Sequence, residues 1–166
     1  MILTNKVCLR PSADTISTLW YISRCCNRAW NRFIEQRREA YAAGRRITKY
    51  DQKKRLPTFK REDERFRDPS SQTLQEVTFT VDDAYESFFA KRKNGDEDAR
   101  PPGFRSSRRF FTQRYPQRGT SFEIEDGRLG LAFGCGRDDW LWVDLPEGNY
   151  DDVTTCRISY DRVSRN

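Results

Sequence analysis

The hydrophobic period of this chain drops from that of a helix to that of a strand near residue 100, and this change constrains the fold more than any other feature. From residue 12 to residue 95, apolar residues recur at spacings of three and four, which is typical of amphipathic helices. From residue 122 they alternate with polar residues, which is typical of half-buried strands. The run Pro101-Pro102-Gly103 separates the two parts. The sequence therefore predicts a helical block followed by several strands.

Two long helices are predicted in the first part. Ser12 has the position of an N-cap for the first helix, and Gly44 supplies its C-terminal stop. Asp68 is the predicted cap of the second helix, with Pro69 in its first turn. The second helix is expected to end at the cations Lys91-Arg92-Lys93, which suit a helix C-terminus. Residues 50–60 predict a short, basic helical piece between the two, and residues 61–67 predict a charged connector.

A single strand is predicted before the helices, where Leu3, Val7 and Leu9 alternate with polar residues up to Pro11. In the second part, Asp126-Gly127 favours a hairpin turn. The strands predicted there cover residues 122–125, 129–133, 140–143 and 153–160. A lone N-terminal strand is an open edge, which pairing with the C-terminal strands would satisfy. We therefore expect an α+β fold in which residues 1–11 and 101–166 form a small β-barrel and residues 12–100 form an inserted helical lobe.

The charge balance favours a polyanionic partner. The 166 residues include 31 Lys and Arg against 25 Asp and Glu, which gives a net charge of +6 and a pI of about 9.2. Only 36% of the residues are hydrophobic and 34% are charged. The predicted core is accordingly thin and the predicted surface densely ionic.

Several function classes do not fit the sequence. The five cysteines include no C-x-x-C pair and the chain has no histidine, so we expect no zinc knuckle, no disulfide framework, no metal site and no cofactor. There is also no Gly-x-Ser-x-Gly motif and no glycine loop for phosphate. The N-terminus lacks the apolar region of a signal peptide and no run reaches membrane-spanning length. We expect a cytoplasmic protein without catalytic residues of its own and without membrane contact.

Four segments together carry a family resemblance. They are the strand at residues 2–10, the arginine-bearing first helix, the segment Ser70 to Gln75 and the segment Arg114 to Gln117. In this order they resemble the N-terminal half of the transposon-encoded TnpB (OrfB) family of RNA-guided nucleases, which is related to the type V CRISPR effectors. The resemblance covers Met1 to about Ser159. It implies an oligonucleotide-binding-like wedge barrel interrupted by a helical recognition lobe.

The resemblance stops before the nuclease. A RuvC nuclease domain needs several carboxylates on separated strands to hold two metal ions, and this sequence ends about where that domain would begin. The acidic pairs at residues 82–83, 138–139 and 151–152 fit solvated charge better. We therefore expect a nucleic-acid-binding module without its own nuclease. Its expected partners are a guide-type structured RNA and duplex DNA, with a separately encoded nuclease half as a further candidate.

The resemblance also implies which residues bind nucleic acid. The short DNA motif beside the target is expected to be read by Tyr50, Ser71, Gln72 and Gln75. Helical spacing and charge, apart from the resemblance, predict contacts to the nucleic-acid backbone from Arg24, Arg28, Arg32, Lys53, Lys54 and Arg55. Arg114, Tyr115 and Gln117 are expected either to contact RNA or duplex or to fix the hinge between the helical lobe and the barrel. The alternative for the arginines is a solvated helix face paired with Glu35 and Glu39, and for the amides it is ordinary polar surface. Base stacking and core packing are both open for Phe110, Phe111, Trp140 and Trp142.

Two further functions remain open. The helical block could act as a helix-turn-helix in a stand-alone DNA-binding regulator that uses no RNA. The chain could also be a structural subunit that completes a separately encoded nuclease. A specific RNA retained through purification would support the guided-nuclease relative, whereas duplex binding that is unaffected by RNase would support the regulator.

Overall fold

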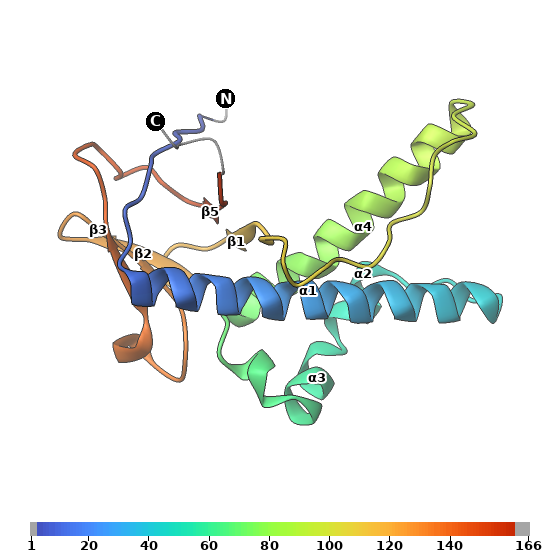
Figure 1. Ribbon diagram of the computed structural model, residues 1–166, viewed down its shortest axis with the longest axis horizontal. Helices are drawn as coiled ribbons and strands as arrows, with labels where there is room; N and C mark the ends of the chain where they lie inside the picture. The colour runs from blue at the N-terminus through green and yellow to red at the C-terminus, as the bar shows by residue number, and fades with distance from the viewer. Residues whose placement is uncertain (1–2, 162–166) are drawn as a thin grey trace.

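The computed structural model describes residues 3–161 and shows an α+β protein in which helices precede small antiparallel sheets (Figure 1). Residues 1–2 and 162–166 of the predicted barrel segments lie outside the described residues. The helices are α1 (Ala13–Ala42), α2 (Lys49–Lys53), α3 (Leu56–Glu62) and α4 (Ser71–Lys93), with 3-10 turns at Glu64–Arg67 and Arg137–Asp139. The strands are β1 (Gln113–Tyr115), β2 (Phe122–Glu125), β3 (Arg128–Leu131), β4 (Leu141–Asp144) and β5 (Cys156–Ile158).

Helix α1 is the axis on which the other elements are assembled (Figure 1). Its N-cap is Ser12, whose hydroxyl accepts a hydrogen bond from the Thr15 N–H at 3.2 Å, as the sequence predicted. The chain leaves the helix through Gly44, whose φ of 69° is a left-handed conformation that glycine adopts without strain. The apolar side of α1 supplies most of the core. Its buried hydrophobic residues are Leu19, Ile22, Cys25, Cys26, Ala29, Trp30, Phe33, Ile34 and Ala40.

Two hydrophobic clusters hold the molecule together. The first joins α1 to α3 and α4, where the Phe33 and Phe59 ring centroids lie 5.4 Å apart and Leu74 and Val77 are buried. The second lies under the sheets and contains Leu19, Tyr115, Phe122, Leu129, Leu131 and Ile158. Since α1 contributes to both clusters, the helical lobe and the sheets pack on the same helix.

The start of α4 differs from the prediction. Asp68 does not cap the helix, because its Oδ2 accepts a hydrogen bond from the Tyr21 hydroxyl at 2.7 Å and its backbone oxygen accepts one from the Gly134 N–H at 2.8 Å. The helix begins two residues after Pro69, and its N-cap Ser70 makes no side-chain capping bond. Asp68 instead connects α1 to the segment that follows β3.

The sheets follow the predicted hairpin. Strand β2 pairs with β3 through Asp126 and Gly127, whose φ values of 52° and 71° are those of a two-residue hairpin turn. Strand β4 pairs with β3 to complete a three-stranded sheet, and β1 pairs with β5 in a two-stranded sheet. Strand β1 was not predicted, because its three residues are too few to show a period.

The predicted N-terminal strand does not form in residues 3–10, which lie outside helices and strands. Leu3 is 79% exposed and Val7 is 40% exposed, so the alternation of apolar and polar residues does not correspond here to a buried and an exposed side of a strand. The Lys6 Nζ lies 3.5 Å from the Asp161 carboxylate, so the first and last described segments of the chain meet at this ion pair. None of the helices between residues 3 and 161 combines the length and apolar character that a membrane crossing requires.

Candidate nucleic-acid interface

A groove of about 510 Å³ lies where α2 and α3 meet the first turns of α4. It brings together five residues that the sequence analysis assigned to nucleic acid, from two segments about twenty residues apart. The groove is lined by Tyr50, Lys53, Lys54, Leu56, Pro57, Lys60, Ser71 and Gln75. Its lining therefore combines ammonium groups, an amide, a hydroxyl and an aromatic ring, with no carboxylate among these residues.

Local interactions fix the α2 side of the groove. A capping box starts the helix, in which the Thr48 hydroxyl accepts from the Asp51 N–H at 3.2 Å and the Asp51 carboxylate accepts from the Thr48 N–H at 2.9 Å. Gln52 is only 1% exposed and its Nε2 donates to the Phe33 carbonyl of α1 at 2.9 Å. Because Gln52 points into the core, the next two residues, Lys53 and Lys54, lie at the groove.

Tyr50 is an exposed aromatic residue among cations. Its side chain is 59% exposed, and its ring lies edge-on to Phe79 with centroids 6.5 Å apart. The Lys49 Nζ is 5.6 Å from the centre of the Tyr50 ring, and the Lys53 Nζ is 6.0 Å from that of Phe79. Packing against Phe79 orients the ring without burying it, which leaves a face that a base or sugar can contact.

Lys60 is a groove residue that the sequence analysis did not select. Its Nζ donates to the Ser71 hydroxyl in the first turn of α4, and burial lowers the pKa of this lysine below its usual range. The adjacent helix start has no side-chain cap. An ammonium group, a hydroxyl and uncapped N–H groups can all donate hydrogen bonds to a phosphate. The basic character of residues 50–60 was the available signal, but it could not show which lysine reaches α4.

The two glutamines of the Ser70 to Gln75 segment have different positions. Gln75 lines the groove. Gln72 donates instead from its Nε2 to the Oε1 of Gln117, which follows β1, at 2.7 Å. The amide pair therefore joins two of the segments that carry the family resemblance.

The three predicted arginines of α1 are not all left without an ion-pair partner. Arg32 pairs with Glu62 of α3 at 2.9 Å and its guanidinium lies 4.7 Å from the centre of the Phe59 ring. Its partner is thus neither Glu35 nor Glu39. Arg24 is exposed and Arg28 half-buried, and neither forms an ion pair within residues 3–161. Arg28 lies close enough to Asp63 to help lower the pKa of that carboxyl, and Arg32 connects α1 to α3, so Arg24 is the least engaged of the three.

The predicted residues near β1 also differ in their exposure. Tyr115 is fully buried and its hydroxyl donates to the Gln113 Oε1 at 2.8 Å, so the surface contact expected for it does not fit this position. Arg114 is half-buried, and its carbonyl accepts a hydrogen bond from Thr73 of α4 at 2.9 Å. Gln117 is exposed, and so is Arg55, which precedes α3.

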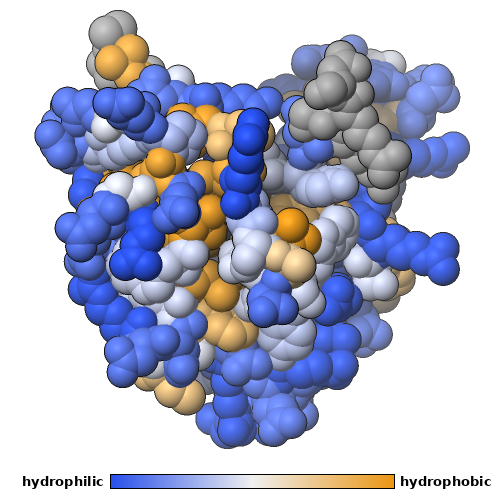
Figure 2. Space-filling model, turned by 60° about the vertical axis from the view of Figure 1, so that its left-hand side comes forward, coloured by the Kyte–Doolittle hydropathy of each residue, from blue (hydrophilic) through white to orange (hydrophobic). Residues whose placement is uncertain are grey.

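The aromatic residues divide into core and surface. Phe111 is buried, and Phe110 packs edge-on against Trp20 with ring centroids 5.1 Å apart. Trp140 and Trp142 are half-buried at β4 and stack on each other at 6.3 Å. The Arg137 guanidinium lies 5.4 Å from the Trp140 ring centre, so the tryptophans already have a cation as neighbour. Figure 2 shows that the surface on this side is mostly hydrophilic, with a narrow hydrophobic band.

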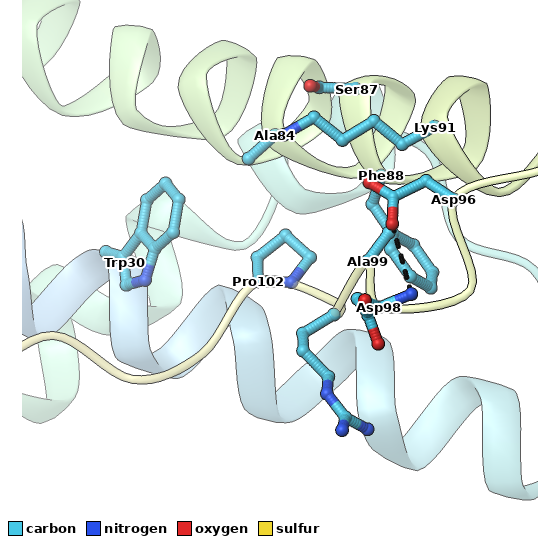
Figure 3. Close-up of a pocket in the computed structure, with 10 residues that line it drawn as sticks. Trp30, Ala84, Ser87, Phe88, Lys91, Asp96, Asp98, Ala99 and Pro102 are labelled. Atoms are coloured by element: carbon cyan, nitrogen blue, oxygen red, sulfur yellow. Dashed lines mark hydrogen bonds between the residues drawn. The ribbon is translucent and has the colours of Figure 1, made fainter. Parts of the chain in front are cut away.

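A second hollow of about 510 Å³ lies between α1, the far half of α4 and the following loop (Figure 3). Trp30 lies on one side of it and Lys91 on the other. Asp96 and Asp98 are on the loop, and the Asp98 N–H donates to the Asp96 carboxylate at 3.0 Å. The mixed charges and the absence of predicted residues from its lining distinguish this hollow from the groove.

One carboxylate in each of two acidic pairs makes a contact within the fold. Asp82 accepts a hydrogen bond from Arg37 at 2.8 Å and lies 3.7 Å from the Lys49 Nζ, and Asp139 accepts one from the Cys135 N–H at 3.0 Å. Across residues 3–161, no group of three or more His, Cys, Asp or Glu side chains could hold a metal ion. Cys25 is buried, and burial raises the pKa of its thiol to about 11, so this side chain packs as a small hydrophobe.

Comparison with known proteins adds no relative. A scan against the profiles of protein families finds no match, and a search of the curated proteins finds no similar sequence.

Proposed function

We propose that this protein is a nucleic-acid-binding module of the kind found in the N-terminal half of TnpB-type RNA-guided nucleases. In this proposal the wedge-like part is an oligonucleotide-binding-like barrel and residues 12–100 are the recognition lobe. Its ligands are a guide-type structured RNA and duplex DNA. The observation that carries the proposal is the groove, which gathers Tyr50, Lys53, Lys54, Ser71 and Gln75.

The chemistry of the groove supports this assignment. Lys53, Lys54 and Lys60 provide charge for phosphates, which dominate the affinity of proteins for nucleic acid. Gln75 provides an amide donor and acceptor for a base edge. The exposed Tyr50 ring provides a surface for stacking. Positioning and sequence reading can therefore take place in the same groove.

The basic surface extends beyond the groove along α1. Arg24 and Arg28 have no ion-pair partner among the described residues, which leaves both guanidinium groups for a phosphate backbone. Such contacts recognise a guide-target heteroduplex by its shape and backbone rather than by its sequence. We assign Arg24 and Arg28, but not Arg32 or Tyr115, to backbone binding.

A stand-alone DNA-binding regulator is the second candidate. The observation that favours it is the exposure of Ser71 in the first turn of α4, because recognition helices of helix-turn-helix proteins read bases with their N-terminal residues. RNase treatment separates the two candidates. Duplex binding that requires a co-purified RNA supports the guided-nuclease relative, and duplex binding that survives RNase supports the regulator.

We also propose that the chain binds without cutting, as a partner of a separately encoded nuclease half. The contacts of Asp82 with Arg37 and of Asp139 with the Cys135 N–H support this, because these carboxylates are already used in contacts within the fold. Incubation with single-stranded and duplex DNA and magnesium or manganese should yield intact DNA. Cleavage that persists through repeated purification would contradict this proposal.

The salt dependence of binding tests the groove. The K53Q/K54Q/K60Q variant should bind duplex DNA more weakly, and the slope of log affinity against log salt should fall by roughly 0.9 for each phosphate that the variant no longer neutralises. The matched control is K91Q/R92Q/K93Q, which removes the same charge from the far end of α4. Equal effects of the two variants would show that the groove has no special role and that binding follows net charge alone.

A further inference from the structure

Gln117 is an exposed residue whose backbone is held by several hydrogen bonds. Its N–H donates to the Ser121 hydroxyl at 3.1 Å. Its carbonyl accepts from the Ser121 hydroxyl at 2.9 Å and from the N–H groups of Thr120 and Ser121 at 3.3 and 2.9 Å. Ser121 itself is fully buried. Four hydrogen bonds thus hold the turn in which Gln117 projects from the surface.

The side chain of Gln117 is held as well. Gln72 of α4 donates from its Nε2 to the Gln117 Oε1 at 2.7 Å. The Oε1 of Gln72 is buried and has no partner within residues 3–161. A buried acceptor without a donor is costly. The Gln72 amide therefore leaves its Oε1 without a hydrogen bond while its Nε2 donates to Gln117. Ordering the Gln117 side chain costs conformational entropy as well.

The fixed amide presents a defined hydrogen-bonding pattern. The Gln117 Nε2 has no acceptor among the described residues, and its Oε1 retains a second lone pair beside the bond from Gln72. A donor next to an acceptor is the pattern with which glutamine recognises adenine in the major groove, through N7 and N6. Pre-ordering the amide reduces the entropy that binding would otherwise cost.

We infer that Gln117 is a specificity-determining residue for an adenine in the duplex bound at the groove, and that Gln72 is the positioning residue that sets its amide. The inference rests on the proposed function, because the groove next to Gln72 supplies the affinity. It also changes the division of roles, since the sequence analysis assigned base reading to Gln72 and only a backbone contact to Gln117.

Selection from a randomised duplex library tests Gln117. For the wild type we expect a preferred motif with adenine at one position. Gln117→Ala should reduce the preference at that position by about tenfold while the salt slope stays unchanged, because a base contact discriminates and a phosphate contact does not. Thr120→Ala is the matched control, since Thr120 is exposed in the same turn and only its N–H is hydrogen-bonded.

Two substitutions at Gln72 test the positioning role. Gln72→Met keeps the size of the side chain but removes the donor, so the adenine preference should weaken without loss of non-specific affinity. In Gln72→Glu the carboxylate can only accept, which turns the Gln117 amide to donate toward it and reverses the pattern offered to the base. The adenine preference should then be lost, whereas Thr120→Glu, which adds the same charge nearby, should keep it.

The outcomes separate this inference from the proposed function. A preference that survives in Gln117→Ala, together with salt-dependent binding, overturns the role of Gln117 and leaves the groove intact. Uniform loss of affinity for all sequences shows that Gln117 contacts the backbone, as the sequence analysis expected, and also overturns the inference. A wild type without any preference overturns the inference, and one without salt-dependent binding overturns the proposed function as well.

Discussion

At the scale of single residues, Gly130 shows how one missing side chain shapes the outer face of the sheet. Gly130 is opposite Trp142 in the β3–β4 register, and a Cβ at Gly130 would lie 2.6 Å from the Trp142 ring. Gly130→Ala should therefore destabilise the protein by about 1–3 kcal/mol, the usual cost of overpacking, as measured by urea unfolding. Gly136→Ala is the control, because a Cβ there meets no atom within 4 Å, and equal losses in both variants would show that the indole does not need this space.

Asp63 gives the clearest pH dependence at this scale. Hydrogen bonds from Arg65, whose Nε lies 2.8 Å from the carboxylate, lower the pKa of Asp63 to about 2. A carboxyl group with a depressed pKa stabilises the fold above its unfolded value near 4 and loses this contribution as the pH falls toward 2. Asp63→Ala should lose about 1 kcal/mol at pH 7, in the range of a lost helix cap. Its deficit relative to the wild type should shrink between pH 4 and pH 2 in urea titrations, and a constant deficit would contradict this linkage.

The two glutamines of α4 show what a helical period can and cannot predict. Residues three apart on a helix differ by about 60° in direction, so the sequence placed Gln72 and Gln75 on one surface. Strand β1 packs at this position on α4, where the Arg114 carbonyl accepts a hydrogen bond from Thr73. Gln72 therefore meets Gln117 just after β1, whereas Gln75 lines the groove. Since β1 is only three residues long, no sequence pattern indicated the contact that divides the two amides.

At the scale of elements, the junction between α4 and β1 depends on one buried hydrogen bond. Thr73 is 1% exposed and its hydroxyl donates to the Arg114 carbonyl at 2.9 Å. Thr73→Val keeps the shape and removes the donor, so it should cost about 1–3 kcal/mol of unfolding free energy in chemical denaturation. Thr80→Val is the matched control, because the Thr80 hydroxyl bonds only to the Glu76 carbonyl of its own helix. A similar loss in both variants would mean that the inter-element bond contributes nothing beyond helix propensity.

The elements that the sequence predicted well are those whose signals are local. The cap at Ser12, the cations at the end of α4 and the turn at Asp126 and Gly127 depend on neighbouring residues only. The strand predicted at residues 2–10 required a distant partner, and so did the cap at Asp68, which bonds to Tyr21 and Gly134 instead. At Asp68 tertiary partners overrode the local preference, whereas residues 3–10 have no strand partner among the described residues.

At the scale of the whole molecule, the charge is divided between the two ends of the sequence. Residues 1–118 contain 26 Lys and Arg against 15 Asp and Glu, a net charge of +11, whereas residues 119–161 contain 3 Arg against 10 Asp and Glu, a net charge of −7. The net +6 of the chain hides this division. A polyanion is attracted to the helical part and to the groove, and is repelled by the outer face of the β2–β3–β4 sheet.

This division predicts which surface nucleic acid covers. Hydrogen exchange with and without duplex DNA should show added protection in residues 49–75 and 114–118, because these contain the groove and the Gln72–Gln117 pair. Residues 123–152 should exchange unchanged, since their carboxylates oppose a phosphate backbone and Arg137 already covers Trp140. Base stacking on Trp140 and Trp142 would instead protect β4 and quench indole fluorescence. Protection confined to the sheet would place the nucleic acid on the acidic side and contradict the electrostatic argument for the groove.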